Sequence, residues 1–313
     1  MTPIGTLTLN PAIDKNTRVE RVVADDKLRC DAPRREPGGG GINVARVVHR
    51  LGGAARALYT SGGLTGTMLE GLLDGEDVAH TPVAIDEGTR ENMIVHETST
   101  DRQFRFGMPG PTLAEDELAA CLDALRALDP GPDYLVASGS LPPGLPDDTY
   151  ATVAEAAHDI GARAVLDTSG TALREARGAG WYLLKPNLRE LEQLTGASLV
   201  TDDERIEAAR DVIARGWCEV VVLSMGASGA LLITADRVEH VRTPTVPIKS
   251  RVGAGDSMVG GLTLALARGH DLRDAVRFGV AAGAAAVMTP GTELCRRGDT
   301  ESLYEQMAPT GPH

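Results

Sequence analysis

Hydrophobic and polar positions follow two rhythms along most of the chain. Short apolar runs rich in β-branched residues alternate with longer runs whose apolar residues recur three and four positions apart, as in amphipathic helices. The predicted strands cover residues 4–9, 55–63, 133–140, 162–170, 181–187 and 218–226. The predicted helices cover residues 42–53, 149–161 and 203–216, and a run from near Asp256 to a stop at Gly269. This order predicts an α/β fold, a mainly parallel sheet flanked by helices.

Two segments interrupt this rhythm. Residues 16–36 alternate with period two and contain no helical run, and residues 90–107 have the pattern of a hairpin around the sequence TSTD. We expect them to form a small inserted β-lid over the main site, because lids exclude water and order substrates. An edge extension of the main sheet is the alternative. No linker separates independent units, so we expect one domain over residues 1–313.

Composition and charge narrow the function classes. The chain has 313 residues, 42% of them hydrophobic, and a net charge of -13 without any run of Lys and Arg, which argues against nucleic-acid binding. The four cysteines form no CxxC pair, which fits a reduced compartment. The first residues lack a secretory signal, and the apolar run 279–288 is too short to cross a bilayer. We therefore expect a cytoplasmic protein without a membrane partner.

A run of four glycines precedes the helix predicted from residue 42. Glycines before a helix expose backbone N–H groups and allow a ligand to approach closely. The sequence PGGGGIN is neither a P-loop nor GxGxxG, because Ile42 and Asn43 stand where those motifs need other residues. The Asn43 amide suits a polyol. Asp14, just beyond the first strand, suits a sugar hydroxyl, although acids are also common in turns.

Four cations lie on the two inserted segments: Lys27, Arg29, Arg90 and Arg105. Guanidinium groups bind phosphate oxygens in two-point fashion, so a lid that carries them suits a phosphorylated small substrate. The alternative is that these side chains are only solvated.

Two further motifs leave two interpretations open. Asn187 and Glu190 in KPNLREL share one helix face, which suits Mg²⁺, but a helix capping box has the same spacing. Lys185 at the strand end can reach a phosphate. The glycine-rich run 224–232 is either a hairpin or a phosphate or ribose contact.

The sequence VGAGDSMVGG places an acid at the start of an apolar helix. Free N–H groups after Gly253 form an anion hole for a phosphoryl group, and Asp256 can accept a proton from an attacking hydroxyl. The alternative is an acid that only caps the helix.

The motifs TLNPAID, GGGGINVAR, KPNLRE and VGAGDSMVGG, in this order, resemble the PfkB branch of the ribokinase-like sugar kinases. The resemblance implies a ribokinase-like core, a homodimer formed through the lids, and transfer of the γ-phosphoryl group of MgATP to the C1 hydroxyl of fructose 6-phosphate. Tagatose 6-phosphate and fructose 1-phosphate are alternative substrates. Gly40, where many 1-phosphofructokinases have Lys, argues against the latter. A non-catalytic sugar-phosphate sensor is a further alternative.

The resemblance also implies residue roles. Asp256 would be the general base, beside an anion hole of Gly253, Ala254 and Gly255. Sugar hydroxyls would be held by Asp14, Gly39 and Asn43, and the 6-phosphate by Lys27, Arg29, Arg90 and Arg105, some from the partner subunit. ATP would contact Lys185, Asn187, Ser224, Gly226, Gly229 and Gly283. Mg²⁺ would be held by Glu190 and, through water, Asn187. A monovalent cation such as K⁺ would lie near Ser250, Val252, Ala286 and Gly291.

Overall fold

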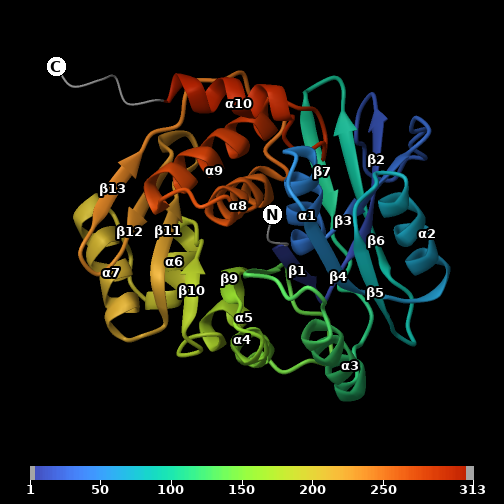
Figure 1. Cartoon of the computed structure of the whole chain (residues 1–313). Coiled ribbons are helices and arrows are strands. Elements are labelled where there is room, and N and C mark those ends of the chain that lie inside the picture. The colour runs from blue at the N-terminus through green and yellow to red at the C-terminus, as the bar shows by residue number, and fades with distance from the viewer. Residues whose placement is uncertain (1–3, 308–313) are drawn as a thin grey trace.

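The computed structural model describes residues 4–307, and its centre is a large twisted sheet (Figure 1). Within the described residues this sheet has nine strands in the order β13-β12-β11-β10-β9-β8-β1-β4-β5. The seven strands from β11 to β5 are parallel, and β12 and β13 are antiparallel additions at one edge. Their bounds are β1 Ile4–Thr8, β4 Ala55–Ser61, β5 His80–Ala84, β8 Tyr134–Ser138, β9 Arg163–Asp167, β10 Trp181–Leu184, β11 Cys218–Ser224, β12 Ala230–Ile233 and β13 Val238–Val241. The mainly parallel α/β fold is thus confirmed.

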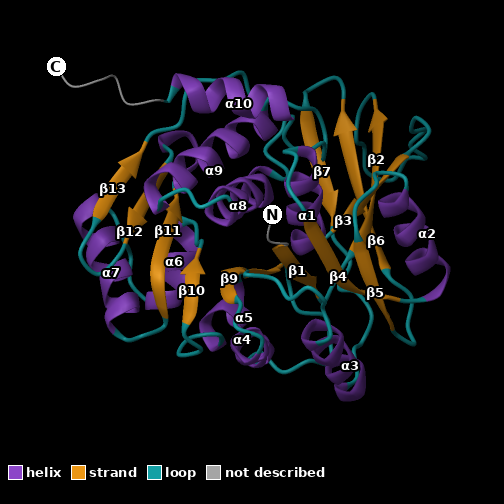
Figure 2. Ribbon diagram, viewed as in Figure 1, coloured by secondary structure: helices purple, strands orange, loops and turns teal. Residues whose placement is uncertain are grey.

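Helices cover both faces of this sheet (Figure 2). In β11, Val220 and Val222 join one hydrophobic cluster and Val221 and Leu223 the other, because successive side chains of a strand point to opposite faces. The first cluster is covered by α1 Gly40–Arg50, α8 Ala254–Ala267, α9 Leu272–Val287 and α10 Arg297–Gln306. The second is covered by α3 Glu115–Arg126, α4 Thr149–Asp159, α5 Gly170–Glu175, α6 Leu188–Thr195 and α7 Asp202–Ala214.

A second, smaller sheet stands beside the first (Figure 1), as the two interrupting segments predict. Its order is β3-β2-β6-β7, with bounds β2 Ala12–Val19, β3 Arg34–Gly38, β6 Arg90–Glu97 and β7 Arg102–Phe106. The TSTD turn joins β6 and β7 as an antiparallel hairpin, as predicted. The strand β2 begins at Ala12 rather than near residue 16, because its pairing with β6 already starts there. Helix α2 Gly63–Asp74 packs against β2 and β3.

Strand register places the polar residues of the second sheet on one face. Asp14 of β2 lies opposite Glu36 of β3 and Asn92 of β6. Asn16 of β2 lies opposite Ile94 of β6, and Ile94 lies opposite Arg105 of β7. Directly opposed residues share a face, and so do residues two positions apart along a strand. One face of this sheet therefore carries carboxylate, amide and arginine side chains as neighbours.

Both glycine-rich runs enter helices earlier than predicted. Helix α1 begins at Gly40 and α8 begins at Ala254, each two residues before the predicted start. The preceding residues, Gly39 at φ +114° and Gly253 at φ +74°, adopt backbone conformations that favour glycine. The run 224–232 forms a hairpin between β11 and β12, one of its two predicted interpretations.

Within residues 4–307, no helix is both long enough and apolar enough to cross a membrane.

The contact between α8 and α9 depends on glycine. A Cβ atom on Gly279 would lie 2.7 Å from the Met258 carbonyl oxygen and 2.9 Å from the Leu262 Cβ. We predict that Gly279→Ala lowers the free energy of unfolding by about 1–3 kcal/mol, because the two helices must separate. Gly71→Ala, on the exposed face of α2 with no atom within 4 Å of the new Cβ, is the control and should raise it by about 1 kcal/mol. Urea unfolding measures both, and equal stability of the two variants would contradict the close packing.

Candidate active site

Asp256 lies in the first turn of α8, where helix geometry leaves backbone donors free. The N–H groups of the first turn have no acceptor within the helix, and Gly253 as the N-cap provides no side chain to take them. They are therefore free beside the half-buried carboxylate. Its Oδ2 accepts a hydrogen bond of 2.8 Å from the Asn43 amide Nδ2, which comes from the first turn of α1. The sequence thus predicted the position of the acid, but not this partner.

The surroundings of Asp256 make it a base suited to neutral pH. Burial, together with the nearby charges of Asp167 and Asp14, raises its pKa to about 6, although the Asn43 hydrogen bond and the Lys185 charge act in the opposite direction. At pH 7 most of the carboxylate is ionised, and its proton affinity is high enough for proton transfer. A carboxylate that only caps a helix would need neither burial nor neighbouring acids that raise its pKa.

Lys185 and Asp167 form a buried pair next to this helix. Lys185 follows β10 and is 6% exposed, and its Nζ lies 3.1 Å from Oδ1 of Asp167, the last residue of β9. Burial lowers the pKa of Lys185, but the charge and hydrogen bond of Asp167 raise it above its ordinary value, so the lysine is a cation. A Cβ on Gly255 would lie 3.8 Å from this Nζ, so the cation stands beside the first turn of α8.

Sequence reasoning missed Asp167. The same pattern that pointed to Asp14 could have found it, because Asp167 is also an acid at the carboxyl end of a predicted strand, where ligands bind in parallel sheets.

Asn187 and Glu190 form the capping box of α6. Asn187 Oδ1 accepts from the Glu190 backbone N–H at 3.0 Å, and Glu190 Oε2 accepts from the Asn187 N–H at 2.8 Å. Burial raises the pKa of Glu190. The box uses one oxygen of the carboxylate, and Oε1 takes no part in it. Among residues 4–307, no group of three or more His, Cys, Asp and Glu side chains is placed to hold a metal ion.

Of the remaining predicted nucleotide residues, Ser224, Gly226 and Gly229 lie beside this box or in the turn that follows it, and Gly283 faces the start of α8. Ser224 at the end of β11 bridges to Asn187, and its N–H donates to the Pro186 carbonyl. Gly226 and Gly229 form the turn that follows, with φ values of +56° and +94°. Gly283 on α9 faces α8, since a Cβ there would lie 3.2 Å from the Ala254 carbonyl oxygen.

Asp14 and the glycine run form the other end of the site. Asp14 Oδ1 accepts a 2.9 Å hydrogen bond from Asn92, its cross-strand neighbour. A Cβ on Gly38 would lie 2.6 Å from Asp14 Oδ2, and a Cβ on Gly39 would lie 2.8 Å from the Thr8 side chain. Burial raises the pKa of Asp14, while Asn92, Arg105 and Arg90 oppose this shift. The glycines are thus required for the close approach of β2, β3 and α1.

The structure brings two of the four predicted phosphate ligands to this end. Arg105 lies on the polar face of the second sheet, and Arg90 donates to the carbonyl oxygens of Asn10, Pro11 and Met108. Lys27 and Arg29 lie in an exposed loop between β2 and β3, and neither side chain makes a hydrogen bond or ion pair with another predicted site residue among residues 4–307.

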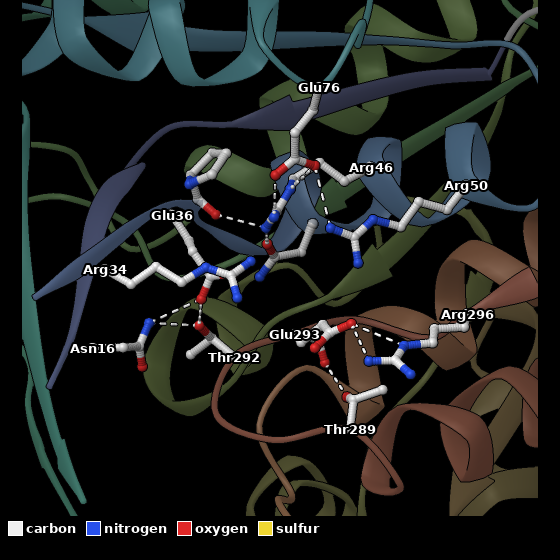
Figure 3. A network of polar contacts seen from close by, with 12 residues as sticks. Asn16, Arg34, Glu36, Arg46, Arg50, Glu76, Thr289, Thr292, Glu293 and Arg296 are labelled. Carbon is white, nitrogen blue, oxygen red and sulfur yellow. Dashed lines mark hydrogen bonds and ion pairs between the residues drawn. The ribbon is translucent and has the colours of Figure 1, made fainter. Parts of the chain in front are cut away.

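A buried carboxylate ties the second sheet to the main unit. Glu36, 4% exposed, accepts hydrogen bonds from the Asn16 amide and the Thr292 hydroxyl through Oε2, and Arg34 Nη2 lies 3.0 Å from its Oε1 (Figure 3). Asn16 also donates to Thr292 at 2.7 Å. Thr292 belongs to the loop after α9, so this network joins two strands of the second sheet to that loop.

The groups predicted to hold a monovalent cation come from three places: Gly291 in this loop, Ala286 in the last turn of α9, and Ser250 and Val252 just before α8. The Gly291 carbonyl accepts a 2.6 Å hydrogen bond from the Ser250 hydroxyl, and the Ala286 carbonyl accepts from Thr289. The Val252 N–H donates to the Ser250 oxygen at 3.2 Å. The Ala286 carbonyl accepts from both the backbone N–H and the hydroxyl of Thr289, whereas the Gly291 carbonyl keeps a second lone pair, so an oxygen donor suited to a hard cation is present at Gly291.

Comparisons with known proteins agree with one another on the family of this chain. A protein from Mycobacterium tuberculosis named ATP-dependent 6-phosphofructokinase isozyme 2 is 46% identical over 97% of this chain and 90% of its own length. The crystal structure of phosphofructokinase-2 from Escherichia coli with potassium has a TM-score of 0.94 and 42% identity, covering 98% of this chain and all of that one. The E. coli structure in complex with fructose-6-phosphate has a TM-score of 0.92, 41% identity and the same coverage. The model of the pfkB family carbohydrate kinases matches residues 7–297, so the chain belongs to this family.

Proposed function

We propose that this chain transfers the γ-phosphoryl group of ATP to the C1 hydroxyl of fructose 6-phosphate, giving fructose 1,6-bisphosphate. The observation that carries this proposal is the carboxylate of Asp256, with a pKa near 6, beside the free N–H groups of α8 and the buried cation Lys185. A base, an anion hole and a cation at one point are what phosphoryl transfer to a hydroxyl requires.

The second sheet supports a phosphorylated sugar as the acceptor. Asp14 and Asn43 offer hydrogen-bonding groups suited to sugar hydroxyls, next to the glycine run that admits a ligand closely. Arg105 offers hydrogen-bond donors for the sugar phosphate, and so does Arg90 through the N–H groups that do not bind carbonyl oxygens. The relatives described above act on or bind fructose 6-phosphate by name, which agrees with this assignment.

We assign ATP to the edge formed by Lys185, Asn187, Ser224, Gly226, Gly229 and Gly283. Oxygen donors of Asn187 and Glu190 fit Mg²⁺, directly or through water, because Glu190 Oε1 is outside the capping box. When bound, Mg²⁺ would neutralise charge on the phosphates. We assign a K⁺ site to the carbonyl groups near Ser250, Val252, Ala286 and Gly291, an assignment supported by the potassium complex of the E. coli relative.

In this mechanism the chain's own residues act mainly through position. The arginines of the second sheet hold the phosphate end of the sugar, so that its free hydroxyl faces the nucleotide. Asp256 Oδ2 is held by Asn43, which leaves Oδ1 to accept the hydroxyl proton. Lys185 and the N–H groups of Ala254 and Gly255 stabilise negative charge on the transferred group.

We further propose a homodimer formed through the second sheets. Its face opposite the polar one exposes apolar area, since Met93 and Phe106 are cross-strand partners and are 44% and 48% exposed. Lys27 and Arg29 lie in the exposed loop between β2 and β3 of this sheet, which supports a contribution to the site of the partner.

The experiment that tests the activity is a coupled ADP assay with fructose 6-phosphate, tagatose 6-phosphate and fructose 1-phosphate. Fructose 6-phosphate should give the highest kcat/KM. Asp256→Asn should lower kcat by roughly 100-fold or more with little change in KM, because it removes the proton acceptor and keeps the shape. Absence of turnover with every sugar phosphate would favour a sensor, and a near-normal kcat of the variant would remove Asp256 as the base.

The phosphate assignment predicts a change in KM. Arg105→Ala should raise the KM for fructose 6-phosphate about tenfold or more, with a smaller change in kcat, because a charge-assisted contact is lost. Arg126→Ala is the control, since Arg126 lies on α3, which covers the main sheet, and pairs with Asp159. Steady-state kinetics compares the two variants, and an equal KM in both would contradict the assignment.

The dimer proposal predicts that charge on the apolar face separates the subunits. Phe106→Asp should give a monomer in light scattering coupled to size-exclusion chromatography, because a charge would be buried without a partner. Val200→Asp, at a 73% exposed position before α7, should leave the oligomeric state unchanged. A Phe106→Asp protein with the mass of the wild type would exclude this face as the interface.

A further inference from the structure

We propose that Arg46 is a positioning residue that fixes the orientation of the Asn43 amide and, through it, the carboxylate of Asp256. This inference rests on the proposed function in that it treats Asp256 as the base. Arg46 does not touch the reacting groups. It acts through a chain of contacts that starts at Glu76, outside the glycine run, and ends at Asp256.

Arg46 is among the largest fully buried side chains of the described structure. It is 1% exposed and lies on α1 one turn after Asn43. Its guanidinium makes four hydrogen bonds: Nε to Glu76 Oε2 at 2.9 Å, Nη2 to Glu76 Oε1 at 2.6 Å, Nη1 to the Pro37 carbonyl at 2.8 Å and Nη1 to Asn43 Oδ1 at 3.1 Å. Figure 3 shows the two-point contact with Glu76. Such a fork has little freedom to rotate.

The donors and acceptors on each side settle how the Asn43 amide is turned. A guanidinium only donates hydrogen bonds, so the amide atom facing Arg46 must be the oxygen. An ionised carboxylate only accepts, so the amide atom facing Asp256 must be the nitrogen. With Arg46 in place, the flipped amide would set an oxygen against the carboxylate and an NH₂ against the guanidinium. Arg46 thereby holds an N–H on Oδ2 of Asp256.

This orientation matters for the base because the Asn43 donor favours the ionised form of Asp256. The other charged groups that act on this carboxylate are Asp167 and Asp14, which oppose ionisation, and Lys185, which favours it. An amide that turns freely would weaken the only side-chain hydrogen bond that Asp256 receives from residues 4–307. The pKa of Asp256 would then rise, and its Oδ1 would lose its fixed direction.

The cost of burying Arg46 supports a role beyond packing. Its helix neighbours Ile42 and Val47 are also buried, and a hydrophobic residue at position 46 would avoid the desolvation of a charge. Glu76 offsets that cost. Burial alone would raise the pKa of Glu76, but the hydrogen bonds and charge of Arg46, with Arg50, hold it below its usual value. A second arginine, Arg50, contacts the same carboxylate from a half-exposed position, 3.4 Å away.

Arg50 provides a matched control for the test. It lies on the same helix as Arg46 and shares Glu76, but it has no contact with Asn43 among residues 4–307. Arg46→Lys keeps the charge but loses the two-point hydrogen bonding of the guanidinium. It should lower kcat about tenfold and move the acid limb of the pH profile of kcat/KM to higher pH, and thermal melting checks that the variant is folded. Arg50→Lys should leave kcat and the pH profile unchanged. The substrate phosphate titrates equally in all variants, so a difference between their pH profiles comes from the protein.

A double-mutant cycle separates positioning from general destabilisation. If Arg46 acts through Asn43, Arg46→Lys should have almost no further effect on kcat in an Asn43→Ala background. An undiminished effect in that background, or equal kinetics of Arg46→Lys and Arg50→Lys, would overturn the proposal.

A measurement without substrate separates this proposal from the assigned activity. Carbon-13 NMR of the aspartate carboxyl groups, with Asp256→Asn for assignment, reports the pKa of Asp256 directly. Arg46→Lys should raise this pKa by at least ~0.5 units relative to wild type and Arg50→Lys should not. An unchanged pKa in Arg46→Lys would refute the positioning role even if the kinase activity is confirmed. An upward shift without kinase activity would leave the positioning role intact and refute the function.

Discussion

The hydrogen bond between Asn43 and Asp256 joins two helix N-termini that lie 213 positions apart in the chain. Each of these helices begins directly after a glycine with a positive φ, at Gly39 and at Gly253. The close approach of α1 and α8 depends on backbone without a side chain, because a Cβ on Gly260 would lie 2.6 Å from Val47 Cγ1. The rest of the site is arranged around this meeting point at the carboxyl edge of the sheet.

Cations near this point offset part of the negative charge of the protein and of the site. The chain carries a net charge of -13, and three carboxylates, Asp14, Asp167 and Asp256, influence one another at the site. Phosphate groups would be repelled unless local cations outweigh this field. Lys185 is buried against Asp167, and Arg90 and Arg105 act on Asp14. Burial, together with this crowding of acids, raises the pKa of Asp256 and so suits it to the proposed role of base.

The second sheet is more than a cover, because Glu36 connects it to the loop after α9. That loop also receives the Ser250 hydroxyl at Gly291, only a few residues before the anion-hole turn. The ends of the site proposed for the sugar and for phosphoryl transfer therefore share one hydrogen-bonded frame. A lid attached in this way can position a ligand against α8 rather than merely shield it.

The sequence by itself determined the features that depend on neighbouring residues. Strand and helix rhythm, the glycine-rich turns, the TSTD hairpin and the place of Asp256 in a first helical turn all follow from local pattern and backbone preference. Only the tertiary structure decided which side chains meet across the sheet edge: Asp167 with Lys185, Asn43 with Asp256, and Arg46 with Glu76. It also placed Lys27 and Arg29 in an exposed loop. These outcomes escape the sequence because the contacts are long-range, and their geometry is set by strand order and helix packing rather than by spacing along the chain.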